Sequence, residues 1–72
     1  MTTEYAPIIK KAQLDKQVAE MRLNAANLTH SASCIERNDE LEIKTRQEIH
    51  ALQDIILDNV AIIFHCIAKQ NE

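Results

Sequence analysis

Histidine and cysteine have the most distinctive chemistry in this sequence, and one pair of them has a helical spacing. His30 and Cys34 are four residues apart, which places both side chains on one face of a helix. An imidazole and a thiolate supply half of a tetrahedral zinc site. The other half would have to come from a second copy or from another helix, and no H-x-x-x-H or C-x-x-C pattern completes it. The sequence alone therefore predicts no metal site.

Catalysis has no support elsewhere in the chain. No nucleophile stands at a recognisable spacing from a base and an orienting group, and there is no glycine with which a loop could cradle phosphate. An acidic cluster at residues 36–42 is interpreted as the capped, solvated start of a helix. Cys34 and Cys66 are expected to be small hydrophobic residues, too far apart for a disulfide. We expect no catalytic residues, no cofactor and no enzymatic activity.

The composition predicts an all-α chain. It has no glycine and one proline, its only aromatic residues are Tyr5 and Phe64, and strand signals are missing. Most of the commonest residues are good helix formers. A chain of 72 residues buries a smaller fraction of its surface than a larger domain does, so its stability alone would be marginal. We therefore expect a single domain that oligomerises or binds a partner.

Charge and hydropathy restrict the environment of the protein. The net charge is −3, and Lys10-Lys11 is the only adjacent basic pair, so the basic stripe typical of nucleic-acid binding is absent. The N-terminal residues lack the pattern of a signal peptide. Residues 55–68 are apolar but fall short of the ~20 residues that span a bilayer. We expect a cytoplasmic protein with reduced thiols, no nucleic-acid partner and no membrane insertion.

Residues 49–68 predict a helix with an unusually wide apolar face. At about 100° per residue the apolar arc covers roughly 250°, whereas one packing partner needs about 100°. One neighbour within so short a chain cannot easily cover that arc. We therefore expect this helix to pack against its own chain and also against something else.

Two heptad series predict an antiparallel helical hairpin that forms a single domain over residues 1–72. The helices are expected at about 7–36 and 40–70, after a frayed arm at residues 1–6. The turn is placed at about 37–39 with Asp39 or Asn38 as N-cap, and a turn near 29–33 is the alternative.

Each expected helix carries a packing seam with alternating spacings of three and four. For the first helix the seam is Leu14, Val18, Met21, Ala25, Leu28, Ala32 and Ile35. A weaker stripe, mostly alanine, lies on nearly the opposite face: Ile8, Ala12, Ala19, Leu23 and Ala26. For the second helix the seam is Thr45, Ile49, Leu52, Ile56, Asn59, Ile63 and Cys66. A polar residue such as Asn59 commonly fixes register or partner choice.

The second helix resembles one known family. Arg46, then Ala51-Leu52, then an apolar run ending in Ile62-Ile63 and Ile67 near the chain end are similar to the small two-helix co-chaperone of bacterial type III secretion needle subunits. The resemblance covers about a third of the chain. It implies a cytoplasmic, non-enzymatic hairpin that docks on a larger tetratricopeptide-repeat chaperone. The pair would then hold the needle subunit unpolymerised.

The resemblance and the seam together predict the residues that contact a partner. They are Leu52, Ile55, Ile56, Asn59, Ile62, Ile63 and Cys66. Two other functions remain open. Two hairpins could form a homodimeric four-helix bundle that regulates RNA or a transcription factor. The chain could also be a needle-type subunit, but such a subunit is expected to have a proline in its turn, and residues 36–42 contain none.

Overall fold

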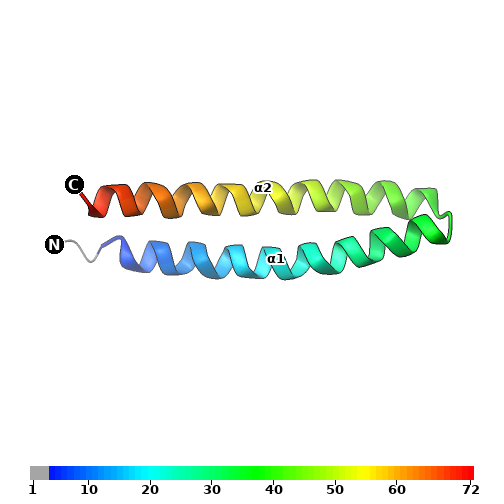
Figure 1. Cartoon of the computed structure of the whole chain (residues 1–72), viewed down its shortest axis with the longest axis horizontal. Coiled ribbons are helices and arrows are strands. Elements are labelled where there is room, and N and C mark those ends of the chain that lie inside the picture. The colour runs from blue at the N-terminus through cyan, green and yellow to red at the C-terminus, as the bar shows by residue number, and fades with distance from the viewer. Residues whose placement is uncertain (1–3) are drawn as a thin grey trace.

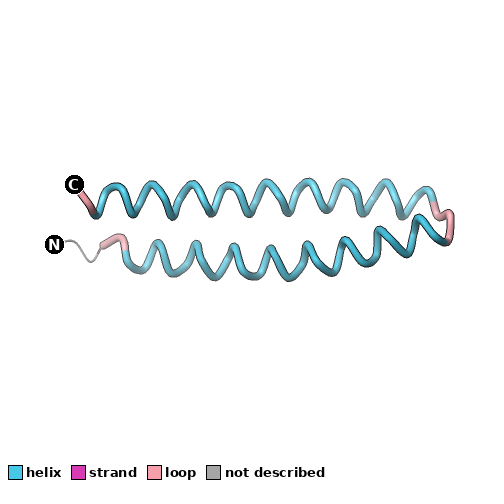
Figure 2. Tube along the Cα trace, in the orientation of Figure 1, coloured by secondary structure: helices cyan, strands magenta, loops and turns pink. Residues whose placement is uncertain are grey.

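A computed structural model describes residues 4–72 as an antiparallel helical hairpin (Figure 1). Helix α1 runs over Ala6–Ile35 and helix α2 over Asp39–Gln70, with residues 36–38 between them. Figure 2 shows the connecting loop at one end of the rod, which measures 56 × 14 × 11 Å between Cα atoms. No strand occurs in the described part of the chain. The predicted all-α hairpin is confirmed.

Helix α1 begins at Ala6, the last residue of the expected frayed arm. Residues 1–3 of that arm are outside the described residues, while Glu4 and Tyr5 form a turn that leads into the helix. Pro7 follows at the second helical position. A proline is tolerated there because the first backbone N–H groups of a helix have no partner within it.

Helix α1 ends without glycine by placing Arg37 in the left-handed region, at φ 56°. The backbone N–H of Asn38 donates to the Ser33 carbonyl at 2.9 Å, and that of Arg37 donates to the Cys34 carbonyl at 3.3 Å. This pair of bonds is the Schellman motif, in which the residue after the C-cap is left-handed. The left-handed residue is therefore Arg37.

Asn38 instead forms the N-cap of α2. Its side-chain oxygen accepts a hydrogen bond from the Leu41 N–H at 3.2 Å. Asp39, Glu40 and Glu42 lie in the first turn, where negative charge complements the helix dipole. The alternative turn near residues 29–33 is wrong, because α1 continues through Ile35.

We expect Arg37→Gly to stabilise the hairpin. A left-handed conformation costs a non-glycine residue about 1–2 kcal/mol, and glycine relieves that cost while adding about 0.5–1 kcal/mol of lost chain entropy. The net gain is expected to be about 0.5–1 kcal/mol, measured by urea denaturation followed by circular dichroism. Arg46→Gly, two turns inside α2, is the control and should be destabilising. A loss of stability in Arg37→Gly would contradict the left-handed conformation.

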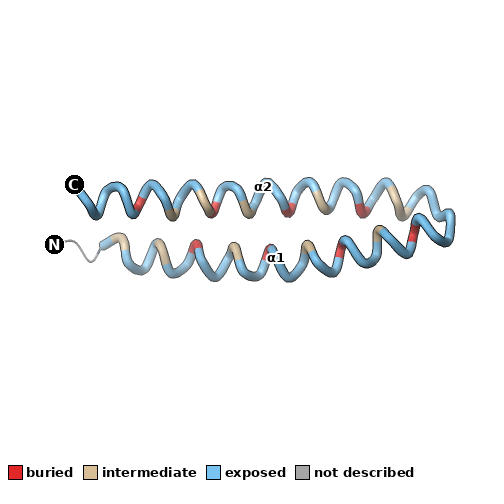
Figure 3. The backbone as a smooth tube through the Cα atoms, viewed as in Figure 1, coloured by how far each residue is buried: buried red, intermediate tan, exposed pale blue. Residues whose placement is uncertain are grey.

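The two helices pack along one seam in which buried residues recur every seven positions. The buried residues are Ala12, Ala19, Ala26 and Ser33 of α1 and Thr45, Leu52, Asn59 and Cys66 of α2. Figure 3 shows them along the facing sides of the helices. Half-buried Leu23, Ile49 and Ile56 pack against the cluster of Ala19, Ala26 and Leu52. A seven-residue repeat is the spacing of coiled-coil packing.

The structure confirms the seam predicted for the second helix and corrects the one predicted for the first. Every residue of the predicted α2 seam is buried or half-buried. Every residue of the predicted α1 seam is exposed, from Leu14 to Ile35, and the alanine stripe, apart from exposed Ile8, packs in its place. The physical reason is size. Large side chains already line α2, and small ones opposite them let the two backbones approach closely.

Candidate functional site

The structure divides the seven predicted partner-binding residues into two groups. Leu52, Ile56, Asn59, Ile63 and Cys66 lie in the seam, where α1 covers them. The side chain of Asn59 donates to the Ile55 carbonyl at 2.9 Å, so its amide is engaged within α2. Only Ile55 and Ile62 are exposed, at 45% and 43%. A partner that approaches the folded hairpin can therefore reach these two isoleucines more readily than the other five residues.

Helix α1 exposes a continuous apolar stripe that the sequence had assigned to the interior. This outer stripe comprises Leu14, Val18, Met21, Leu28 and Ile35, which are 46% to 83% exposed. Its members keep the spacing of three, four and seven residues that a neighbouring helix requires. Single exposed apolar residues are normal in proteins, but a continuous row along a whole helix marks an interaction surface.

The outer stripe meets the exposed apolar residues of α2 at Val18. One shallow groove between the helices is lined by Val18 of α1 and Ile55 of α2, and also by the charged residues Asp15 and Arg22 of α1. Ile62 lies seven residues beyond Ile55 and therefore on the same flank of α2. We call the part of this surface that excludes Ile35, at the end of α1, the docking face: Leu14, Val18, Met21, Leu28, Ile55 and Ile62.

The opposite flank of the hairpin is less uniform. A second groove there is lined by Gln13, Lys16, Val60, Ile63 and Phe64. Its α1 side is polar, whereas its α2 side is apolar. Leu57, Phe64 and Ile67 of α2 are also exposed. The wide apolar arc expected for residues 49–68 is thus only partly covered by α1.

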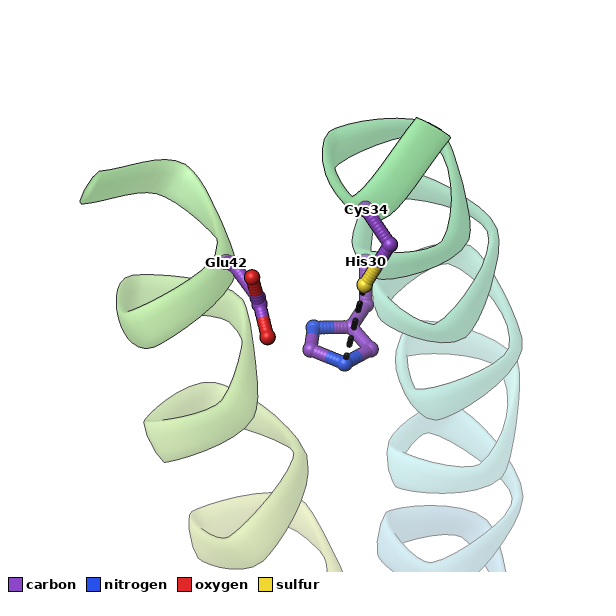
Figure 4. A group of neighbouring side chains, drawn as sticks. All are labelled: His30, Cys34 and Glu42. Atoms are coloured by element: carbon purple, nitrogen blue, oxygen red, sulfur yellow. Dashed lines mark hydrogen bonds between the residues drawn. The ribbon is translucent and has the colours of Figure 1, made fainter. Parts of the chain in front are cut away.

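A cluster of possible metal ligands lies beside the turn (Figure 4). His30 and Cys34 project from the end of α1, and Glu42 projects toward them from the start of α2. One ligand atom from each of the three side chains lies within 4.8 Å of the others. His30 and Glu42 are half-buried, while Cys34 is exposed. The sequence identified the pair on α1 but gave no place to Glu42, because that required the register between the helices.

Thr45 fixes the orientation of the His30 ring. Its hydroxyl donates to the backbone carbonyl of Leu41 at 2.8 Å or of Glu42 at 3.1 Å. While its proton is engaged there, the same oxygen accepts from His30 in the tautomer that carries its proton on Nδ1, which lies 2.8 Å away. With its proton on Nδ1, the ring keeps a lone pair on Nε2, which lies 3.8 Å from the Cys34 sulfur. A dashed line marks this contact between Nε2 and the sulfur in Figure 4.

By length and composition alone, α2 is long and apolar enough to cross a membrane. Of the stretch that meets this test, 17% is buried in the hairpin. The helix therefore has apolar surface that either protein or lipid could cover.

Comparison with known proteins returns no relative. No family model, no curated protein and no solved structure matches the chain. The resemblance to the needle-subunit co-chaperone remains a prediction.

Proposed function

We propose that the chain is a non-enzymatic protein-binding module that presents the docking face to a helical partner. The observation that carries the proposal is the outer stripe of α1, a row of large apolar side chains at heptad spacing on a helix whose other face is already packed. The docking face lacks the nucleophile, base and orienting group that a reaction requires. Its geometry suits packing against another helix.

A helical-repeat protein is the partner class that we favour. Such proteins stack helix pairs into extended concave surfaces, and a rod 56 Å long could lie along such a groove. An amphipathic helix binds a hydrophobic groove through residues spaced by three, four and seven, as the outer stripe is. In line with the family resemblance, we propose a cytoplasmic co-chaperone that docks on a tetratricopeptide-repeat chaperone and thereby helps to hold a needle subunit unpolymerised.

A homodimeric four-helix bundle is the second candidate. Exposed Ala25 and Ala32 lie between the larger residues of the outer stripe, and this pattern of small and large side chains would also fit a second copy of α1. The solution mass of the isolated chain distinguishes the two candidates.

Insertion of α2 into a membrane is disfavoured by its ionisable residues. Asp54, Asp58 and His65 fall within its apolar part, and a charged side chain at the centre of a bilayer costs about 2.5 kcal/mol or more. We therefore propose that protein, not lipid, covers the exposed part of α2.

The test is a titration of the chain against a tetratricopeptide-repeat chaperone of a type III secretion needle subunit. Light scattering should show a monomer or a loosely associating species alone, and a complex of defined mass with the chaperone. Met21→Asp and Ile62→Asp should each keep the helicity of the isolated chain, because both side chains are exposed. Each should weaken binding about 30-fold or more if the residue is a hot spot worth about 2 kcal/mol.

The matched control is Asn27→Asp, which adds the same charge to an exposed position of α1 outside the outer stripe. It should bind as the unmodified chain does. A dimer whose mass does not change on dilution, with no complex formed, would reject the co-chaperone proposal in favour of the homodimer. Equal binding by the control and both docking-face variants would reject the docking face itself.

A further inference from the structure

We propose that His30, Cys34 and Glu42 form a zinc-binding site that joins α1 to α2 beside the turn. This site is separate from the docking face and does not depend on the identity of any protein partner. Two ligands come from the last two turns of α1 and the third from the first turn of α2 (Figure 4). The folded hairpin therefore assembles a ligand set that neither helix carries alone.

The distances fit one tetrahedral metal ion. Zinc binds sulfur at about 2.3 Å and imidazole nitrogen at about 2.0–2.1 Å, so tetrahedral geometry separates the two ligand atoms by about 3.6 Å. The Cys34 sulfur and the His30 Nε2 are 3.8 Å apart. The carboxylate of Glu42 belongs to the same group, in which one ring nitrogen of His30, the Cys34 sulfur and one carboxylate oxygen lie within 4.8 Å of one another. Binding of all three to one ion requires rotation of these side chains from the positions shown in Figure 4.

The surroundings of His30 already hold the ring as a metal ligand needs it. A metal-binding histidine nearly always donates its other ring N–H to a fixed acceptor, which sets the tautomer and the ring orientation. Here Thr45 is that acceptor, at 2.8 Å, and it is only 2% exposed. Thr45 is therefore a positioning residue for the proposed site, and Nε2 is the nitrogen that would bind the ion.

The ligand types favour zinc over magnesium or calcium. Thiolate and imidazole are ligands of zinc, whereas the hard divalent cations prefer oxygen alone. When the ion binds, the Cys34 sulfur forms a bond to zinc and its proton passes to solvent. The thiolate and the Glu42 carboxylate then balance the two positive charges of the ion. Because Cys34 is exposed, solvent can reach the site and water can occupy the fourth position.

Among residues 4–72, which the structure describes, Arg46 is the one cation that forms an ion pair with a ligand of this site. Its guanidinium lies 2.8 Å from Oε1 of Glu42, as an ion pair four residues apart on α2. Such exposed pairs contribute little to stability, so zinc would compete against a weak interaction. The second carboxylate oxygen also remains as a possible ligand atom while the pair is kept.

Binding should stabilise the turn end of the hairpin. An ion that binds only the folded chain raises the melting temperature by mass action, and for a domain of this size the rise is about 10 °C or more when free zinc is about 100 times its Kd. The experiment is thermal unfolding of the full chain, kept reduced, with and without zinc. A parallel titration with cobalt(II) reports the ligands through the thiolate charge-transfer band and the intense visible bands of a tetrahedral ion.

We expect one cobalt ion per chain and both spectral features. His30→Gln and Cys34→Ser should each lose the melting shift and weaken the affinity about 100-fold or more, and Glu42→Gln should weaken it about 10-fold or more. Thr45→Val should keep the helicity but weaken the affinity about 10–100-fold, with rescue by Thr45→Ser.

The chain offers close controls for each ligand type. Glu40→Gln changes an exposed carboxylate in the same turn of α2, and Cys66→Ser changes the other thiol, buried far from the turn. Both should bind cobalt as the unmodified chain does. The proposal is overturned by binding that survives Cys34→Ser, by one ion shared between two chains, or by no binding at roughly micromolar to millimolar metal.

Discussion

Leu52→Asp is expected to unfold the isolated chain. Leu52 is the one large side chain that is buried among the apolar residues of the seam, and only 7% of it is exposed. Removing a buried leucine side chain costs about 2–5 kcal/mol, and burying an unpaired carboxylate costs several kcal/mol more. Small domains have about 0.05–0.15 kcal/mol of stability per residue, so the loss approaches or exceeds the total. Circular dichroism at 25 °C should therefore show a largely unfolded chain.

Leu57→Asp is the matched control for that experiment. It is the same substitution five residues along the same helix, at a side chain that is 65% exposed. We expect the helicity of this variant to stay close to that of the unmodified chain, because surface substitutions change stability by about 0.5 kcal/mol or less. If both variants unfolded equally, α2 would not have the buried and exposed faces described above.

Ala19→Leu is expected to have the second largest effect. Ala19 is 4% exposed and belongs to the central cluster with Ala26 and Leu52. Three extra heavy atoms at this position would force the helices apart, and overpacking of this kind costs about 1–3 kcal/mol. The free energy of unfolding should fall by that amount in urea denaturation, even though leucine is a more apolar residue and a good helix former.

The companion variant, Ala25→Leu, tests which face of α1 packs. Ala25 lies on the exposed side of the helix, with the outer stripe. Adding a leucine there should leave the stability of the isolated chain within about 0.5 kcal/mol of its original value. The seam that sequence periodicity favoured for α1 predicts the reverse order, with Ala25 buried and Ala19 exposed. The pair of variants therefore decides between the two arrangements directly.

Sequence periodicity predicted the packed face of α2 correctly, because hydrophobicity and close packing favour the same stripe of that helix. The residues that are most apolar, such as Ile56 and Ile63, also lie on the stripe that faces α1. In α1 hydrophobicity and close packing favour different stripes. Hydrophobicity favours the stripe of Leu28 and Met21, whereas close packing favours alanine and serine at every seventh position. Counting apolar residues ranks the first stripe higher, but the approach of two backbones is limited by side-chain volume.

The proposed zinc site was likewise only partly predictable from the sequence. The spacing of His30 and Cys34 is visible in the sequence, because both lie on one helix. Glu42 comes from the other helix, and its place opposite them depends on a short turn that Arg37 closes in a left-handed conformation. No signal in the sequence identified Arg37 for that role. Contacts within one helix could therefore be predicted from residue spacing, whereas contacts across the turn could not.

The narrow seam also determines how freely this protein can change in evolution. Within the described part of the chain, five apolar and three polar residues are buried, and half of the eight are alanine or serine spaced by seven. Most substitutions elsewhere fall on positions that solvent or a partner reaches, where the cost to folding is small. Descendants could replace many of the exposed residues and keep the hairpin. Related chains with this fold would therefore share the seven-residue spacing of small side chains more than they share residue identities.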